Sequence, residues 1–250
     1  SFLSCPIKVF KSQINLLARK GYYFCDWNEL FAHINGEKIL GKKTVMIQFD
    51  DGFLDNWTTV YPFIKKKNLK FSVLLTSDFI EESNSPREFV NETLNEDKSK
   101  WWGYLNKSEI KIMSNSGIVD FQSHAKTHTW YPSSDKLTDI SVENNLYPHI
   151  IWNTKTKQKP LWLNEENFYI EGYPIFEHKK SLELDRAFNV KEEVIQHLKS
   201  LYNSKKSHKE NMEFYKKEIE YIKNKAEIGS YETIEEGNKR IKNELLESKN

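Results

Sequence analysis

Cysteine is scarce in this sequence, and its scarcity excludes a small disulfide-rich domain. Only two cysteines occur among 250 residues, Cys5 and Cys25, and neither belongs to a Cys-x-x-Cys pair. Two cysteines cannot build the disulfide framework of a small secreted domain. They leave the cellular compartment open.

An excess of charge of one sign is also absent. The 37 lysines and arginines balance 36 aspartates and glutamates, for a formal net charge of +1. This balance argues against a protein whose main task is to bind nucleic acid or an anionic membrane, because such proteins carry a basic excess. No apolar run approaches the roughly 20 residues that a membrane span needs. No signal-peptide pattern opens the sequence either.

The residues that are present are typical of a globular protein. The chain is 38% hydrophobic and 14% aromatic, which is enough to fill a core. Its length predicts one large domain or two small ones. Because the chain begins with Ser1 rather than methionine, we expect a longer gene product.

The first half of the chain alternates between helical and strand patterns. Apolar residues at helical spacing predict a helix that ends near Gly21 and another over 57–64. Runs of β-forming residues predict strands at 44–49, 70–76 and 119–123. Alternating strands and helices indicate a parallel sheet or barrel, so the expected fold class is α/β.

Local signals mark the segment before the third strand. A polar stretch over 81–100 predicts an exposed loop. Asn106 and Glu109 have the spacing of a capping box, and they predict a helix that ends at Gly117.

After Trp130 the chain changes character. Residues 131–190 show no clear periodicity and are expected to be irregular, whereas residues 191–226 are rich in lysine and glutamate and predict two helices. Each helix carries an apolar stripe, made of Val194, Ile195, Leu198 and Leu201 in the first and Met212, Tyr215, Ile219 and Ile222 in the second. The stripes fit an antiparallel helix pair that packs on the domain, or alternatively a dimerising coiled coil. Thr233 and Glu236 predict the start of a last helix, whose apolar residues are Ile241, Leu245 and Leu246.

Two adjacent carboxylates follow the first strand, in the segment Phe49-Asp50-Asp51-Gly52. Neighbouring carboxylates repel each other unless a cation lies between them or hydrogen bonds hold one away. The glycine permits a sharp turn close to whatever they bind. Taken alone, an Asp-Asp-Gly turn is more often a solvated loop than a functional site.

Two histidines follow the third strand, in the segment His124-Ala125-Lys126-Thr127-His128. Residues four apart face the same side of a helical turn, so both imidazoles could reach one metal ion. A pair of surface histidines near a loop is the alternative.

The two motifs together carry more information than either alone. In parallel β/α folds, functional residues gather at the carboxyl ends of the strands, where both motifs fall. One aspartate and two histidines make a three-ligand set for a catalytic zinc or a similar divalent ion. The second aspartate is then a candidate base for a metal-bound water.

These residues resemble a known family. The FDDG segment after a strand, followed some seventy residues later by a strand leading into SHAKTH, is similar to the polysaccharide deacetylases of the NodB-homology type (carbohydrate esterase family 4). Gly21-Tyr22 and the helix end at Ser114–Gly117 match the same pattern. The resemblance implies Asp50 as the general base and Asp51, His124 and His128 as ligands of a divalent metal, with zinc expected and cobalt or another transition metal as alternatives.

The resemblance also implies an architecture. It predicts a partial, distorted (β/α) barrel with a largely helical insertion. Residues 1–130 would form the N-terminal part of the barrel, 131–230 the insertion, and 231–250 a core helix that resumes the barrel. The family's Arg-x-Pro-Tyr-type and Leu-His motifs have no counterpart in the sequence, nor does its first strand, so we expect a chain cut at both ends.

The function implied is hydrolysis of N-acetyl groups on a glycan, with an N-acetylglucosamine-type polymer as substrate and partner. A non-catalytic carbohydrate-binding barrel and an O-acetyl esterase are the alternatives, with phosphoester hydrolysis as another metal-dependent reaction. Trp101, Trp102 and Trp130 could stack on sugar rings or simply belong to the core. His149 and His178 receive no role, so the catalytic acid is unassigned. The resemblance favours an extracellular or cell-envelope location.

Overall fold

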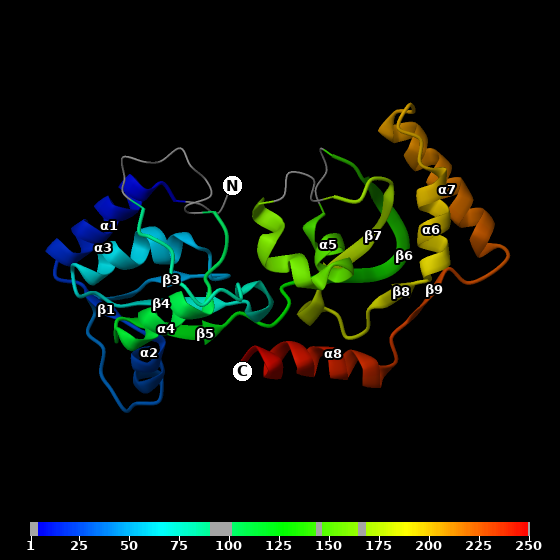
Figure 1. The fold of residues 1–250 in the computed structure, drawn as a ribbon. Coiled ribbons are helices and arrows are strands. Elements are labelled where there is room, and N and C mark those ends of the chain that lie inside the picture. The colour runs from blue at the N-terminus through cyan, green and yellow to red at the C-terminus, as the bar shows by residue number, and fades with distance from the viewer. Residues whose placement is uncertain (1–4, 91–101, 144–146, 165–168, 250) are drawn as a thin grey trace. The chain divides into compact units, whose positions relative to one another are not determined.

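The computed structural model describes residues 5–90, 102–143, 147–164 and 169–249 (Figure 1). The chain divides into two compact units. The first unit contains Ser1–Leu75 and Ile80–Gln122, and the second contains Thr76–Phe79 and Ser123–Asn250. The expected division at residues 130 and 230 stays a prediction, because compactness alone does not distinguish an insertion from a domain.

The first unit alternates helices and short strands. Its helical segments are α1 (Ile7–Arg19), α2 (Trp27–Ile34), the π-helical turn η1 (Asn56–Val60), α3 (Tyr61–Lys65) and α4 (Lys107–Asn115). Its strands are β1 (Tyr23–Cys25), β2 (Thr44–Met46), β3 (Gln48–Phe49), β4 (Phe71–Leu75) and β5 (Val119–Ser123). This order confirms the α/β class expected for the first half of the chain.

The strands of the first unit form two small sheets, and the described residues do not close a barrel. Strand β1 pairs in parallel with β2, while β3 pairs in parallel with β4 in a sheet of order β3-β4-β5. The strand expected over 44–49 is present, but it is divided into β2 and β3. The run changes partner at Ile47, whose carbonyl already accepts a 2.9 Å hydrogen bond from the Ser72 N–H of β4.

A buried glutamate organises the start of α4. The Asn106 side chain accepts from the Glu109 N–H and the Glu109 carboxylate accepts from the Asn106 N–H, each at 3.0 Å, so the predicted capping box is confirmed. The Glu109 side chain is 0% exposed and also binds the Arg87 guanidinium through Oε1 at 2.8 Å and Oε2 at 2.7 Å. Such a bidentate pair compensates the cost of burying the carboxylate. Residues 91–100 of the expected polar loop lie outside the described residues.

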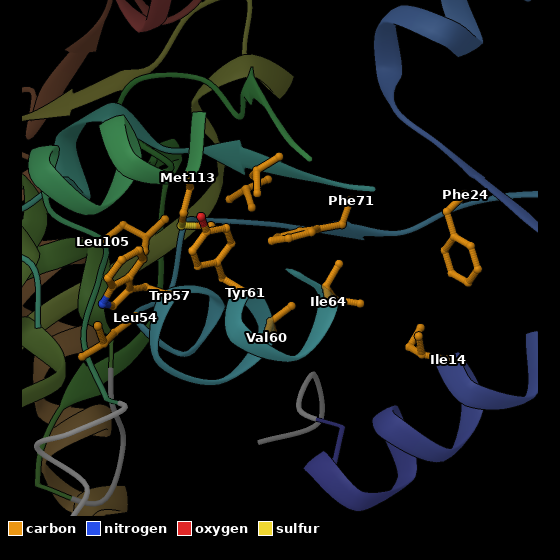
Figure 2. Close-up of a cluster of buried hydrophobic side chains, with 12 residues drawn as sticks. Ile14, Phe24, Leu54, Trp57, Val60, Tyr61, Ile64, Phe71, Leu105 and Met113 are labelled. Carbon is orange, nitrogen blue, oxygen red and sulfur yellow. The ribbon is translucent and has the colours of Figure 1, made fainter. Parts of the chain in front are cut away.

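The core of the first unit gathers side chains from α1, η1, α3, β4 and α4 (Figure 2). Its labelled members include Ile14, Trp57, Val60, Tyr61, Ile64, Phe71 and Met113. The predicted apolar positions between 57 and 64 are thus confirmed as core. The helix expected there is a π-helical turn followed by α3, and Pro62 near the start of α3 has no N–H to donate to an α-helical ladder.

The second unit contains two antiparallel strand pairs and four α-helices among its described residues. The strands are β6 (Trp130–Ser141), β7 (Tyr173–Lys180), β8 (Phe188–Val190) and β9 (Gly229–Tyr231). The helices are α5 (Pro148–Thr154), α6 (Glu192–Leu201), α7 (His208–Lys223) and α8 (Ile234–Leu246), with 3-10 segments η2 (Ser77–Phe79), η5 (Thr156–Asn164), η6 (Ser181–Glu183) and η7 (Glu247–Lys249). None of the helices among the described residues has the length and apolar character that a membrane span requires.

The expectation that residues 131–190 are irregular is wrong. Strands β6 and β7 pair antiparallel from Trp130 opposite Lys180 to Ser141 opposite Tyr173. The register shifts twice, between Pro132 and Leu137 and just after Leu137. Each bulge changes which side chains face inward, so the alternation that would announce a strand is lost from the sequence.

The apolar stripes of α6 and α7 are confirmed as core. They pack with residues of β6 and β7 in one hydrophobic cluster, which includes Ile140, Phe176, Leu198, Tyr215 and Ile219. Residues 131–230 are thus mixed rather than largely helical, since their helices pack on strands β6 and β7. The burial of the stripes within this unit favours the helix pair that packs on the domain over the dimerising coiled coil.

Helix α8 begins as predicted, but of its expected apolar residues only Ile241 is half-buried. The Thr233 side chain accepts from the Glu236 N–H, and Glu236 accepts from the Thr233 N–H, which completes the capping box. The expected apolar residues Leu245 and Leu246 are 49% and 48% exposed. The buried residues of this helix are Gly237 and Glu244.

We expect Leu198→Ala to lower the free energy of unfolding by about 2–5 kcal/mol, because Leu198 is fully buried and its removal leaves a cavity. Urea unfolding measures this loss. The control Gln196→Ala changes an exposed position of the same helix and should alter stability by less than about 0.5 kcal/mol. A Leu198 variant that keeps its stability and instead changes the oligomeric state would favour the coiled-coil alternative.

Candidate metal centre

The two aspartates of the candidate site follow β3 in the first unit. Asp50 is exposed, and its Oδ1 accepts a 2.8 Å hydrogen bond from the Gln48 side-chain amide. Asp51 and Gly52 both have left-handed backbones, with φ of 66° and 72°. The left-handed φ favours glycine at residue 52, and a Cβ there would also lie 2.6 Å from Leu75 Cδ2, so that side chain would have to shift. The direction of both carboxylates depends on this tight turn.

The two histidines lie in the loop between β5 and β6, in the second unit. Their ring centroids are 5.3 Å apart and the ring planes differ by 28°. The expectation that they share a helical turn is wrong, because residues 124–129 are not helical and both Ala125 and His128 have left-handed backbones, with φ of 66° and 48°. Such a conformation costs a non-glycine residue about 1–3 kcal/mol. The imidazoles face each other because the loop folds back on itself.

Aromatic side chains surround the His128 ring. Its centroid lies 6.4 Å from that of Phe79 and 6.3 Å from that of Trp152. Phe79 and Trp152 in turn pack edge to face, with centroids 5.2 Å apart. These contacts restrict the rotation of the imidazole, as a metal ligand requires.

The residue types of the candidate set suit a divalent metal ion. Asp51 offers a carboxylate oxygen, and His124 and His128 each offer an imidazole nitrogen, which are donors that zinc and similar ions bind. Three protein ligands of this kind suit a catalytic zinc ion, which keeps further positions for water and substrate. Asp50, next to Asp51 in the chain, carries a second carboxylate, and its role as a candidate base stays a prediction.

The sequence analysis missed two buried charged residues that bind the histidine loop. Glu244 of α8 is 3% exposed and Lys159 of η5 is 2% exposed. Glu244 follows the buried Gly237 by two helical turns, so a charged residue on the inner face of α8 was the available signal. No comparable pattern in the sequence marks Lys159.

The aromatic residues considered for sugar stacking differ in what the structure describes. Trp101 lies outside the described residues. Trp130 packs against two imidazoles, with ring centroids 5.3 Å from His178 and 6.3 Å from His149. Sugar stacking by Trp102 or Trp130 stays a prediction.

His149 and His178 form a second pair of imidazoles in the second unit. Their ring centroids are 4.6 Å apart, and both line a pocket of about 170 Å³ between α5, β6 and β7. His178 Nδ1 lies 3.0 Å from the Phe176 carbonyl, and because a carbonyl can only accept, Nδ1 is the donor of this hydrogen bond. Burial, together with the neighbouring His178, lowers the pKa of His149 to about 3.

The comparisons with known proteins agree with the motifs. The family described as polysaccharide deacetylase matches residues 37–162, which is half of the chain and includes both the aspartate and the histidine segments. The chain belongs to this family. YxkH of Bacillus subtilis (strain 168) is 25% identical over 126 residues, which cover 50% of this chain and 38% of that protein. The chain therefore spans less than half the length of this curated relative.

Two solved structures of deacetylases align with about half of the chain. A de-N-acetylase from Aggregatibacter actinomycetemcomitans aligns at 21% identity over 52% of this chain and 48% of that chain, with a TM-score of 0.41. IcaB from Ammonifex degensii aligns at 22% identity over 52% of this chain and 50% of that chain, with a TM-score of 0.42.

We expect His149 to make the protein sensitive to acid. In the unfolded chain this histidine has its ordinary pKa of 6.5, whereas in the folded protein its pKa is about 3. Between these two pH values the unfolded chain therefore binds a proton that the folded protein does not bind. Stability is therefore lost as the pH falls below about 6.5, by at most about 1.4 kcal/mol per pH unit for this group.

His149→Phe should reduce the pH dependence of the urea midpoint between about pH 6.5 and pH 4. His197→Phe is the matched control, because His197 is 46% exposed on α6 and should leave the dependence nearly unchanged. An unaltered slope in the His149 variant would show that its burial does not govern acid sensitivity.

Proposed function

We propose that the protein is a metal-dependent deacetylase that hydrolyses N-acetyl groups of a glycan, with a polymer of N-acetylglucosamine as the substrate class. Membership of the polysaccharide deacetylase family supports the substrate class and the type of reaction. The observation that carries the proposal is the donor set of Asp51, His124 and His128, with a second carboxylate adjacent in the chain.

Each residue has a defined task in this proposal. Asp51, His124 and His128 hold a divalent ion, zinc in the first instance, which supplies Lewis-acid chemistry to the acetyl carbonyl and lowers the pKa of a water molecule. Asp50 accepts the proton of the attacking water. The Gln48 amide binds Asp50 Oδ1 and so fixes the rotation of this carboxylate.

His128→Ala should abolish metal binding and acetate release, because only one histidine of the pair remains. Metal content by elemental analysis and acetate release from N-acetylglucosamine oligomers, measured on the full-length protein, check this. His197→Ala, at an exposed position of α6, is the control and should change neither quantity.

The outcomes separate the alternatives. Retained metal and activity in the His128 variant would contradict the ligand assignment. Wild-type protein that binds metal and glycan without releasing acetate would be a carbohydrate-binding protein. Release of acetate only from O-acetylated glycans would identify an esterase.

Asp50→Asn and Asp51→Asn should have different effects, although the residues are neighbours. The Asp50 variant should keep the metal and lose about 10²–10⁴-fold in turnover, because it lacks the proton acceptor. The Asp51 variant should lose the metal. Metal titration followed by steady-state kinetics distinguishes them, and loss of metal in the Asp50 variant alone would mean that the two roles are reversed.

A further inference from the structure

The backbone of the histidine loop is bound by a carboxylate from α8. Glu244 Oε2 accepts hydrogen bonds from the Lys126 N–H at 3.2 Å and the Thr127 N–H at 2.9 Å. Glu244 Oε1 accepts from the Thr127 hydroxyl. One buried side chain therefore satisfies three donors of two successive residues, and both residues lie between His124 and His128.

An ammonium group binds the same loop from a different element. Lys159 Nζ donates to the Thr127 carbonyl at 3.0 Å and to Asp78 Oδ2 at 2.9 Å. The Asp78 N–H donates to the Lys126 carbonyl at 3.0 Å. The N–H, the carbonyl and the hydroxyl of Thr127 are thus all bound by buried charged side chains.

These bonds occur where the loop most needs support. The left-handed residues Ala125 and His128 flank Lys126 and Thr127, and such conformations persist only when the surroundings determine them. The N–H groups of Lys126 and Thr127 both point at the Glu244 carboxylate only while the loop keeps the bend that Ala125 and His128 make. The same bend places the two imidazoles side by side.

A purely structural role for these charges is the competing explanation. Buried ionic groups are often no more stabilising than apolar residues of similar size, because desolvation offsets their attraction. An apolar residue at position 244 could fill the same space on the inner face of α8. It could not accept the hydrogen bonds that the Lys126 and Thr127 N–H groups donate to Glu244.

We propose that Glu244 is a positioning residue for the metal-binding histidines, with Lys159 completing the support on the carbonyl of Thr127. The metal-binding part of this inference rests on the function proposed above. Glu244 lies outside residues 37–162, the segment matched by the family, so a helix from beyond that segment shapes the loop that carries His124 and His128.

The test is Glu244→Gln, titrated with Co²⁺ as the probe after the protein has been stripped of metal. Glutamine keeps the size of the side chain, but its NH₂ group cannot accept a hydrogen bond, so at least one donor of the loop loses its partner. We expect the dissociation constant for Co²⁺ to rise about 10- to 100-fold, the usual effect of removing a group that orients metal ligands. The visible spectrum of bound Co²⁺ should also change, because the geometry of the ligands changes.

Glu247→Gln is the matched control. Glu247 follows Glu244 by one helical turn and pairs with the Lys126 side chain, but it is exposed and binds no backbone N–H of the loop. Its substitution should leave Co²⁺ affinity and spectrum unchanged. Thr127→Val provides a second route, since it removes only the hydroxyl bond to Glu244 and should weaken Co²⁺ binding less than Glu244→Gln does.

Amide hydrogen exchange tests whether Glu244 holds the loop without any metal being bound. Exchange at Lys126 and Thr127 should accelerate relative to the wild type in Glu244→Leu, which removes both acceptor oxygens, while exchange in β6 stays the same. Unchanged exchange at these two amides, or a lowered melting temperature with unchanged Co²⁺ affinity, would overturn the positioning role. If the wild type binds no Co²⁺, the proposed metal site fails, while the exchange result still decides whether Glu244 holds the loop.

Discussion

The left-handed backbone at the two candidate turns is the constraint on which this molecule depends. Asp51 and Gly52 adopt it after β3, and Ala125 and His128 adopt it after β5. An L-amino acid enters this region only when neighbouring groups compensate the cost. At the first turn a glycine packed under Leu75 provides the space, and at the second the buried side chain of Glu244 provides the hydrogen bonds. The candidate side chains are therefore placed by left-handed backbone conformations that the rest of each unit maintains.

Each unit uses a buried glutamate on a helix to fix a segment that is distant in the sequence. In the first unit, Glu109 of α4 accepts from the Arg87 N–H at 3.0 Å as well as from its guanidinium. In the second unit, Glu244 of α8 accepts from Lys126 and Thr127. A carboxylate suits this task because it accepts several hydrogen bonds, and a low local dielectric strengthens those hydrogen bonds. The cost of burying it is met by satisfying both oxygens.

Features that depend on neighbours in the sequence could be predicted, and features that depend on distant partners could not. The capping boxes at Asn106 and Thr233 and the apolar stripes of α6 and α7 are local patterns, and the structure confirms them. The β6–β7 pair was missed because its bulges erase the alternation. The inner face of α8 was misassigned because a charged residue, Glu244, occupies a core position. For the candidate site, the residue types and their order along the chain were readable, but the non-helical path between His124 and His128 was not.

The contact between Thr127 and Glu244 joins residues 117 positions apart, which has a consequence for how the protein is made. Ribosomes deliver a chain from its N-terminus, and segments begin to fold before the rest has emerged. When the histidine loop leaves the ribosome, α8 has not yet been translated, and the loop's N–H groups have only water as a partner. The loop can take its final path only once α8 has been added. The two imidazoles therefore reach their final positions late in synthesis, after β6, β7 and the helix pair that covers them have been made.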